Sequence, residues 1–542
     1  MTMKNNFVFY FHYKLLIILS LIVIPNTECF PQENRDELIN FQSAKLRYIL
    51  EMAEKYHFDS LDIVAACDKA FSSLLKEFDP QSEYYSKEMS SYIRERYKGV
   101  LVGIGVDLIV ISDTATIANV AEGSPAEALG LRIGDRISAI DLISTVGMNR
   151  EDVLTLLQGD EGTKIEIEIR KFPTRKIEKH SISRLKYDSP SVGANFVIAG
   201  TRVAYILLNR VSEKTPTEFA EALNELNKSD YDYFLLDLRN NPGGYLGQSA
   251  QIADEFLEKG QIICRTQSKT PEFDSVFAAS GNGTLKDMPL VIMMDSNSAS
   301  GAEVIAGAMQ DNDRALVVGM PSYGKASAQK FFNIADSSSF RITVAHYETP
   351  LGRAIQKNLS SDEKVELDPS ARMHMDDENF SKINEMIQKH GGKTHMPIFK
   401  TPKGRTVIGG GGIIPDYFVN YDTTTTLTKV LRAKAIMMTW SMYFIEKNYE
   451  MFENEYKTFE LFDKTFNFTN DDIVHFANFC VANKIWNAEM FKIDRHYILF
   501  HLKALIAYVK WGSNEYNKVM VRTDPFVKKS IEIMNESKAL IK

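Results

Sequence analysis

One stretch of the sequence indicates the architecture of this chain most clearly: Pro289-Leu-Val-Ile-Met-Met-Asp-Ser-Asn-Ser-Ala-Ser-Gly-Ala-Glu-Val-Ile-Ala-Gly-Ala-Met-Gln-Asp-Asn312. Its first part is a short apolar block that predicts a buried strand, and residues 298–312 carry small and apolar side chains at helical spacing. Ser300 is therefore expected on a strand-to-helix turn. At such a turn, free backbone N–H groups and the positive end of the helix dipole can hold a developing oxyanion.

A second apolar block, residues 315–319, leads into Pro321-Ser-Tyr-Gly-Lys325. A hydroxyl becomes a useful nucleophile when a neighbour takes its proton, and a lysine can do so once burial has lowered its own pKa. Bringing a lysine pKa from about 10.4 to about 7 costs about 4 kcal/mol. Only small residues, 326–328, follow Lys325, so its amine can enter a dry pocket. These residues predict that Ser300 and Lys325 form a nucleophile and base pair.

The same loop has a second interpretation, a phosphate site. Residues 319–325 have the glycine and lysine spacing of a P-loop. However, Ala326 stands where the magnesium-binding Ser or Thr belongs, and Pro321 has no N–H to offer a phosphate. These two residues disfavour a nucleotide site. Serines and lysines are common in loops, so the pair by itself is also compatible with ordinary loops that have no catalytic role.

Three short motifs resemble the signature of the carboxyl-terminal processing proteases, also called tail-specific serine proteases. They are Ser-Ala-Ser-Gly-Ala-Glu, Met-Gln-Asp-Asn-Asp-Arg and Gly-Lys-x-x-x-Gln. The resemblance implies that Ser300 is the nucleophile, Lys325 the general base and Gln329 the residue that orients the lysine. It places an aspartate of the family on Asp311, for which we expect a supporting structural role rather than proton transfer.

Two residues depart from the family pattern. Ala326 replaces the usual glycine after the lysine, and Met320 replaces an acidic residue before the loop. Neither change removes a functional group, so both concern the loop geometry and leave the chemistry standing. Ser298 is a rival nucleophile because two serines flank Ala299, and the family's spacing to the lysine favours Ser300.

A second chemical element lies upstream at residues 233–245, Tyr-Phe-Leu-Leu-Asp-Leu-Arg-Asn-Asn-Pro-Gly-Gly-Tyr. Its apolar part predicts a buried strand, and Asn-Asn-Pro-Gly-Gly is turn chemistry that lets another backbone approach closely. By itself the segment is equally well a plain tight turn. The resemblance implies an oxyanion hole in which Gly243 or Gly244 acts with the N–H of Gly301. The sequence does not choose between the first two.

Residues 99–171 alternate strand-like runs with glycine turns, and they include Gly-Ser-Pro-Ala followed by Gly-Asp. This region resembles a PDZ domain of the bacterial protease type. Such domains bind a peptide by adding it as a strand to a sheet edge, and they capture its carboxylate in a nest of backbone N–H groups. The peptide-binding loop is expected at Gly103, Ile104, Gly105 and Val106. A generic small β-rich domain is the alternative.

The N-terminus predicts export. Two lysines precede the apolar run at residues 15–24, which has signal-peptide length and is short for a membrane span. Residues 1–29 are thus expected to be a signal peptide or an N-terminal anchor. The protein is expected in the periplasm or cell envelope, with membrane association through this segment as one option. Cys29 leaves lipoprotein attachment open, although its surroundings make a poor lipobox.

The remaining patterns predict an α/β protease core of strand and helix layers, an inserted β-rich PDZ domain, and helical segments at both ends. The expected order is an N-terminal helical segment at 35–98, the PDZ domain at 99–172, the Ser/Lys protease core at 187–420 and a C-terminal helical domain at 421–542. A polar insertion at 357–403 separates two pieces that are close together in the family. It is expected to form an exposed excursion or lid.

Composition fits a large enzyme of several domains. The 542 residues are 44% hydrophobic and 25% charged, which allows several ordinary cores. A formal net charge of −8 without a long basic tract argues against nucleic acid as the main partner. The four cysteines are scattered without metal spacing, so we expect no metal site, no cofactor and no disulfide framework.

The combined motifs predict an exported serine endopeptidase with a Ser–Lys dyad. It would cleave proteins recognised through their free C-termini, for processing or degradation. Protein or peptide substrates are the expected partners, and a homodimer through the N-terminal helices is implied by the resemblance alone. The alternative is a non-catalytic scaffold that binds peptides through the PDZ domain. Intact Ser300, Lys325 and Gln329 argue against that alternative.

Overall fold

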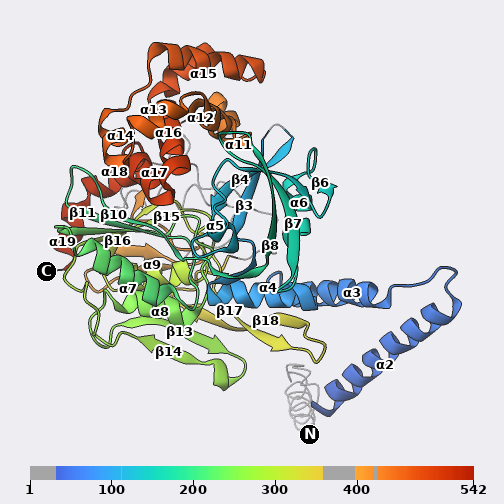
Figure 1. The fold of residues 1–542 in the computed structure, drawn as a ribbon. Helices are drawn as coiled ribbons and strands as arrows, with labels where there is room; N and C mark the ends of the chain where they lie inside the picture. Colours follow the sequence, from blue (N-terminus) through green and yellow to red (C-terminus); the bar gives the residue numbers. More distant parts are fainter. Residues whose placement is uncertain (1–31, 112, 358–396, 420–423, 542) are drawn as a thin grey trace, which may run out of the picture. The chain divides into compact units, whose positions relative to one another are not determined.

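The computed structural model describes four ranges of the chain, which are residues 32–111, 113–357, 397–419 and 424–541 (Figure 1). The chain divides into two units, residues 1–73 and 74–542. The described part of the first unit holds helix α2 (Gln32–Tyr56) and the first part of α3 (Ile63–Phe78). The expected signal segment and most of the expected insertion lie outside the described ranges. None of the helices within those ranges is both long and apolar enough to span a bilayer.

The centre of the second unit is a six-stranded, mostly parallel sheet. Its strands follow the order β10 (Val192–Val197), β11 (Val203–Leu208), β12 (Tyr233–Asp237), β15 (Leu290–Met294), β16 (Ala315–Gly319) and β21 (Tyr417–Phe418). Strand β10 is antiparallel to β11, and the pairs from β11 to β21 are parallel. Strand β15 is buried along its whole length. Its residues are continuously apolar because a central parallel strand is covered on both faces.

Helices cover both faces of this sheet. On one face lie α7 (Thr215–Leu226), α8 (Leu246–Asp254) and α9 (Gly301–Asp311). On the other face lie the last helices of the chain, α18 (Pro525–Glu532) and α19 (Met534–Ala539) (Figure 1). Residues of β11, β12, β15 and β16 alternate between the two apolar clusters, as the two-residue period of a strand requires. The end of the expected C-terminal helical domain therefore packs as part of the central α/β core.

A second sheet carries the lysine loop. Strand β18 (Ser339–Glu348) pairs with β17 (Ser327–Asn333), β13 (Ile262–Ser268) and β1 (Glu83–Tyr85), and β13 also pairs with β14 (Ser275–Ala278). The predicted base lies just before β17. Because β1 comes from the segment before the inserted β-rich module, an early part of the chain reaches the β17–β18 hairpin that follows Lys325.

The two pieces that flank the expected insertion lie together. The Gly410 N–H donates to the Ala354 carbonyl at 2.6 Å, and the Gly412 N–H donates to the Ile355 carbonyl at 2.9 Å. Strand β19 (Ile398–Lys400), which pairs with β20 (Thr406–Ile408), lies within the expected insertion at 357–403, so the last residues of that range belong to a strand pair and not to an exposed excursion. The core is thus closed across the insertion, although the sequence interrupts it there.

The inserted β-rich module is an antiparallel sheet of β3 (Val106–Ile111), β4 (Thr114–Val120), β5 (Arg136–Ile140), β7 (Lys164–Arg170) and β8 (Ile177–Ser183), with β6 (Ile143–Ser144) paired to β5. Its helices are α5 (Pro125–Ala128) and α6 (Arg150–Leu157). Strands β2 (Val100–Gly103) and β9 (Leu185–Asp188) pair, so the chain enters and leaves the module side by side. The sheet extends past residue 172, the predicted end, because the mixed polar run of β8 pairs along all of β7.

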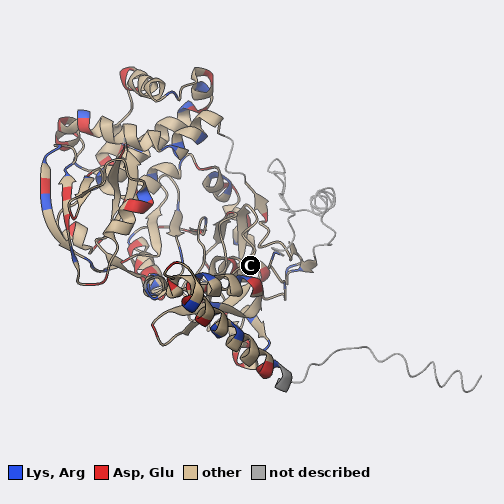
Figure 2. Cartoon of the chain, turned by 90° about the vertical axis from the view of Figure 1, so that its right-hand side faces the viewer, with Lys and Arg blue, Asp and Glu red and all other residues tan. Residues whose placement is uncertain are grey.

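Seven consecutive helices share one apolar core near the end of the chain. They are α11 (Thr426–Ala433), α12 (Ile436–Lys447), α13 (Tyr449–Asn454), α14 (Phe459–Thr465), α15 (Asn470–Ala482), α16 (Ala488–Trp511) and α17 (Ser513–Met520). Thr469 caps α15 by accepting from the Asp472 N–H at 3.2 Å, which confirms the predicted N-cap. Helix α4 (Lys87–Lys98) follows β1, and the 3-10 helix η1 (Pro271–Phe273) lies between β13 and β14. Figure 2 shows acidic and basic residues interspersed on the helices and strands.

Candidate active site

Ser300 lies at the carboxyl end of the parallel sheet, between β15 and α9. Its backbone has φ 53° and ψ −115°, a positive-φ conformation that strains a residue with a side chain. A sharp, strained strand-to-helix turn of this kind exposes a serine hydroxyl at the end of a sheet. The Ser300 N–H donates to the Glu303 carboxylate at 2.7 Å, which holds the turn. The predicted strand-to-helix turn is confirmed at this residue.

The glycine loop after β12 lies against the Ser300 turn. A Cβ placed on Gly243 would come within 2.5 Å of the Gly301 nitrogen and 2.8 Å of the Ser300 Cβ, so a side chain would block this approach. The Gly243 N–H already donates to the Asn241 side chain at 2.8 Å. The N–H groups of Gly244 and Gly301 have no acceptor within the described ranges. These two groups are therefore the free donors beside the serine.

Buried charges hold that glycine loop in place. Asp237, at the end of β12, pairs with the Arg239 guanidinium at 2.6 Å and accepts from the Tyr205 hydroxyl at 2.8 Å. Arg239 also pairs with Asp524, the N-cap of α18, at 2.7 Å. Only 9% of the Arg239 side chain is exposed, and removing one partner of a buried pair leaves an uncompensated charge. The end of the chain is thus tied to the glycine loop through Asp524, a residue that the motifs do not indicate.

Lys325 lies on the loop before β17, with its amine held by Gln329. Its Nζ donates to the Gln329 Oε1 at 3.1 Å, and the Gln329 Nε2 donates to the Gln81 carbonyl at 2.6 Å. The second bond turns the amide oxygen toward the lysine. Burial, aided by the Arg341 charge, lowers the pKa of Lys325 to about 8. No hydrogen bond joins the amine to the Ser300 hydroxyl in the described part of the chain, and catalytic hydrogen bonds often tighten only with substrate bound.

Glu303 connects the serine turn to the lysine loop. It is fully buried, and its carboxylate accepts four hydrogen bonds of 2.5 to 2.9 Å, from the N–H groups of Ser300, Gly324 and Lys325 and from the Ser322 hydroxyl. Burial raises the pKa of Glu303, and these donors oppose that rise. The motifs contain this residue without giving it a role. A glutamate three residues after a serine at a helix start is the signal that points to it.

Tyr347 makes a second connection between the two loops. Its hydroxyl donates to the Ser300 carbonyl oxygen at 3.0 Å and also contacts the Lys325 carbonyl oxygen. Burial raises the pKa of Tyr347 well above its ordinary value, so the phenol stays a neutral donor. The backbones of the predicted nucleophile and base are therefore held by two shared side chains, although their own functional groups are not bonded to each other.

We expect Glu303→Gln to lower kcat by roughly 100-fold. The substitution weakens the hydrogen bonds that hold the Ser300 turn against the Lys325 loop, and a small shift between the two loops misplaces the reacting groups. The amide presents N–H groups to donors, so at least one buried donor loses its acceptor, at about 1–3 kcal/mol of stability. Steady-state kinetics and thermal unfolding measure the two effects. Glu221→Gln, on the exposed side of α7, is the matched control and should behave as wild type. A wild-type kcat in Glu303→Gln would contradict this role.

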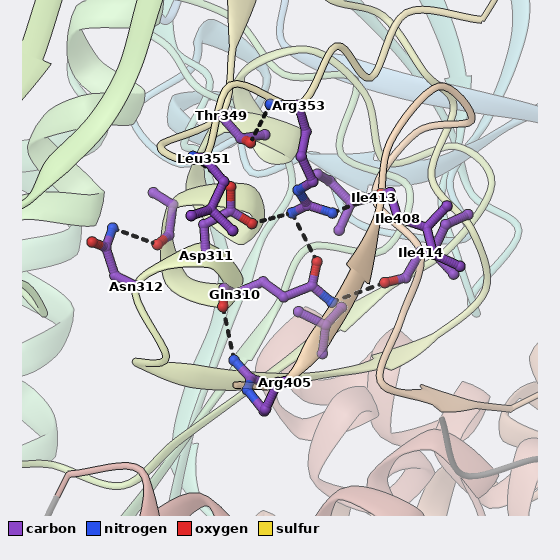
Figure 3. Close-up of polar contacts among 12 residues, drawn as sticks. Gln310, Asp311, Asn312, Thr349, Leu351, Arg353, Arg405, Ile408, Ile413 and Ile414 are labelled. Atoms are coloured by element: carbon purple, nitrogen blue, oxygen red, sulfur yellow. Dashed lines mark hydrogen bonds and ion pairs between the residues drawn. The ribbon is translucent and has the colours of Figure 1, made fainter. Parts of the chain in front are cut away.

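Asp311 lies at the C-terminal end of α9, eleven residues after the serine. Its carboxylate pairs with the Arg353 guanidinium at 2.5 Å, with both side chains fully buried, and accepts from the Leu351 N–H at 3.1 Å (Figure 3). Arg353 also donates to the Ile408 carbonyl at 2.8 Å. The cluster joins α9 to the chain on both sides of the insertion. It favours the structural role that we expect for Asp311.

The two alternatives for the serine and lysine loops fit the geometry less well. Ser298 is fully buried, and its hydroxyl donates to the Leu238 carbonyl at 2.8 Å while accepting from the Asp295 N–H at 2.9 Å. This hydroxyl is used within the turn. Lys325 precedes strand β17, whereas the lysine of a P-loop opens a helix. The nucleotide alternative therefore lacks the helix N-terminus that holds a phosphate.

The predicted carboxylate-binding loop joins β2 to β3 in the inserted module. The N–H groups of Ile104 and Gly105 have no acceptor within the described ranges, and a Cβ on Gly105 would come within 2.1 Å of the Ser124 side chain. Strand β3 is an edge strand and α6 packs beside it, which is the arrangement for adding a peptide strand. The Arg150 side chain on α6 donates to the Leu108 carbonyl of β3 at 2.8 Å, so it covers part of that edge.

Three family models match the chain. Peptidase family S41 matches residues 202–365, which include the central parallel strands and the serine and lysine loops. The PDZ domain matches residues 116–171 within the inserted module. A Family of unknown function (DUF8443) matches residues 427–512, which span most of the helices α11 to α16.

The chain is also similar to named proteases over much of its length. It is 33% identical over 300 residues to a carboxyl-terminal-processing protease of Picosynechococcus sp., covering 54% of this chain and 70% of the relative. It is 31% identical over 346 residues to a carboxyl-terminal-processing protease of Synechocystis sp., covering 62% and 78%. A solved structure titled photosystem II D1 C-terminal processing protease is 26% identical, with a TM-score of 0.34, and the match covers 57% of this chain and 83% of that one.

Proposed function

This chain belongs to the carboxyl-terminal-processing proteases of peptidase family S41, which are serine hydrolases, and on that premise we propose that it is an exported endopeptidase with a Ser300–Lys325 dyad. The predicted fold class is confirmed, with an α/β core, a PDZ domain and a helical region near the end of the chain. One observation carries the dyad. The Lys325 amine, with a pKa of about 8, lies on a loop that shares the Glu303 carboxylate with the Ser300 turn.

In the proposed reaction the uncharged Lys325 amine takes the Ser300 hydroxyl proton as the serine oxygen attacks the substrate carbonyl carbon. The carbonyl oxygen becomes an oxyanion, which the Gly244 and Gly301 N–H groups and the start of α9 stabilise. The protonated lysine then gives its proton to the leaving amine. Water hydrolyses the acyl-enzyme with the lysine again as base, and Gln329 keeps the amine oriented throughout.

Substrate selection through the C-terminus is the second part of the proposal. The Ile104 and Gly105 N–H groups would bind the terminal carboxylate, and the preceding residues would add to strand β3, with Gly103 and Val106 completing the loop. The support is the pair of N–H groups without acceptors at the end of an edge strand. Displacement of the Arg150 side chain from the Leu108 carbonyl would accompany binding.

Amidating the C-terminus of a peptide substrate should lower kcat/KM by about tenfold or more, because a charge-assisted hydrogen bond worth about 1.5–3 kcal/mol is lost. The measurement compares the free acid with the amide of one peptide. Acetylating its N-terminus instead is the control and should change little. Equal kcat/KM for acid and amide would refute C-terminal recognition and leave the dyad untouched.

Export and self-association complete the proposal. The sequence signal for export lies in residues 1–29, and N-terminal sequencing of the protein from its native host tests whether they are removed. An intact N-terminus in the cytosolic fraction would contradict export.

Helix α2 carries large apolar side chains that are exposed in the single chain, including Leu38, Phe41 and Ile49, which supports a homodimer through this helix. Sedimentation at micromolar concentration tests it, and a monomer would contradict it.

A further inference from the structure

Arg341 is a second cation beside the proposed base. It lies on β18, in register with Phe331 on β17 and with Glu83 on β1. Residues directly opposite on neighbouring strands share a face of the sheet, and so do residues two apart on one strand. Arg341 therefore shares a face with Gln329, the residue that holds the Lys325 amine. Its side chain is 15% exposed.

The Arg341 guanidinium is weakly paired for so buried a cation. It donates to the Glu83 carboxylate and to the Tyr97 hydroxyl, both at 3.2 Å, and its Nε has no hydrogen-bond partner in the described part of the chain. Its other close neighbours are the rings of Tyr85 and Phe331, at 5.6 and 5.9 Å from their centroids. The Glu83 side chain is 49% exposed, so water screens its charge and leaves that of Arg341 partly unneutralised.

Four charged groups face the Lys325 amine from the elements packed around it. Arg341 on β18 disfavours the charged amine, whereas Glu303 on α9 and Asp79 and Glu83 in the early segment favour it. The Glu303 carboxylate is engaged by four other donors, and the Asp79 carboxylate is engaged by its own turn. Burial lowers the pKa of Lys325 most, and the Arg341 charge acts next in the same direction.

Two further titratable side chains border the same loop. Tyr347 is a neutral phenol, because burial raises its pKa. The Lys357 amine donates to the Ser322 carbonyl at 2.9 Å and faces Glu303, while burial lowers its pKa. Neither group supplies a negative charge that offsets Arg341. Arg341 thus places a cation on the face where the Lys325 amine meets Gln329.

We propose that Arg341 is a positioning residue that increases the uncharged fraction of the Lys325 amine by placing a poorly neutralised cation on the same face of the sheet. The inference rests on the proposed function, in which Lys325 is the general base. Glu83 acts in the opposite direction, because it partly neutralises Arg341. The Glu83–Arg341 pair, which joins β1 to β18 of the β17–β18 hairpin, therefore sets the pH at which the base becomes active.

The test compares the pH dependence of kcat/KM in wild type, Arg341→Gln, Arg341→Lys and Glu83→Gln, on one unfolded protein substrate. Since the base must be uncharged, activity should rise with pH, and the midpoint reports the pKa of the base in the free enzyme. Arg341→Gln should move the midpoint up by about half a pH unit or more, and Glu83→Gln should move it down. Arg341→Lys keeps a cation and should leave the midpoint near that of wild type.

Opposite shifts in the two glutamine variants would support the inference. An unmoved midpoint in both would overturn it, and so would a change in KM alone, which would make Arg341 a substrate contact. A purely structural role would lower the unfolding temperature and kcat without moving the midpoint. If Arg341→Gln does not fold, Glu83→Gln decides: a downward shift supports the inference, and no shift or an upward one overturns it. Failure of the proposed function looks different, because Lys325→Met would then keep its activity.

Discussion

Ser300→Ala should lower kcat/KM on an unfolded protein substrate by roughly three orders of magnitude or more, because in the proposed reaction the Ser300 hydroxyl forms the acyl-enzyme. The turn itself should survive. It is held by the backbone N–H of residue 300 and the Glu303 carboxylate at 2.7 Å, and alanine supplies the same N–H. Cleavage kinetics and thermal unfolding should therefore separate, with activity lost and the unfolding temperature retained.

Ser298→Ala is the matched control for that experiment. Its hydroxyl makes buried hydrogen bonds to the Leu238 carbonyl and the Asp295 N–H, so its removal should cost about 1–3 kcal/mol of stability. Residue 300 should still be acylated in the folded fraction. Full activity in Ser300→Ala would contradict Ser300 as the nucleophile. A folded Ser298→Ala protein that is no longer acylated would identify Ser298 as the nucleophile instead.

Lys325→Met should also cost roughly three orders of magnitude in kcat/KM, and the double variant with Ser300→Ala should be no worse than the poorer single variant. Groups that act as one catalytic unit show this non-additivity. A methionine of similar length cannot accept the serine proton. Additive losses in the double variant, or a Lys325→Met protein with wild-type activity, would contradict the dyad.

Stability gives an independent readout of the same lysine. Burial lowers its folded-state pKa to about 8, below the ordinary value of 10.5, so at neutral pH the folded state holds a charged amine at a cost. The free energy of unfolding should rise between pH 8 and 10.5, by up to about 3 kcal/mol, as the unfolded state alone keeps the proton. Lys325→Met should lack this rise and be no less stable than wild type at pH 7. Chemical denaturation across that pH range measures it.

The elements of the core were predictable because their signals are local. The apolar block before Ser300 is one buried parallel strand, and the small residues after it form α9. The Thr469 cap was readable for the same reason, since a cap depends on residues three positions apart. The pairing of Lys325 with Gln329 was available only through the resemblance, because it depends on how a strand begins.

The features that the sequence did not reveal are long-range contacts. The preference for Gly244 over Gly243 as the proposed oxyanion donor depends on the Asn241 side chain, which accepts the hydrogen bond of the Gly243 N–H. The role of Glu303 depends on the lysine loop folding back onto α9. Asp524 reaches Arg239 from almost 300 positions away. In each case the residue type is ordinary, and its function follows from a contact that no local pattern encodes.

The insertion and the chain's end show a second limit. Periodicity assigned helices to the last part of the chain, but it could not show that α18 and α19 cover the central sheet while α11 to α17 share a core of their own. A helix has the same apolar periodicity in its sequence whether its apolar face packs against a sheet or against other helices. The assignment of one C-terminal helical domain at 421–542 therefore joined two packing environments.

The most direct test of the account is the rate at which a serine-directed acylating probe labels the wild-type protein across pH, with the labelled residue identified by mass spectrometry. The account predicts one label, on Ser300, at a rate that rises with pH around a midpoint of about 8 and falls to background in Lys325→Met. A label on another residue would contradict it. So would a rate that neither depends on pH nor needs the Lys325 amine.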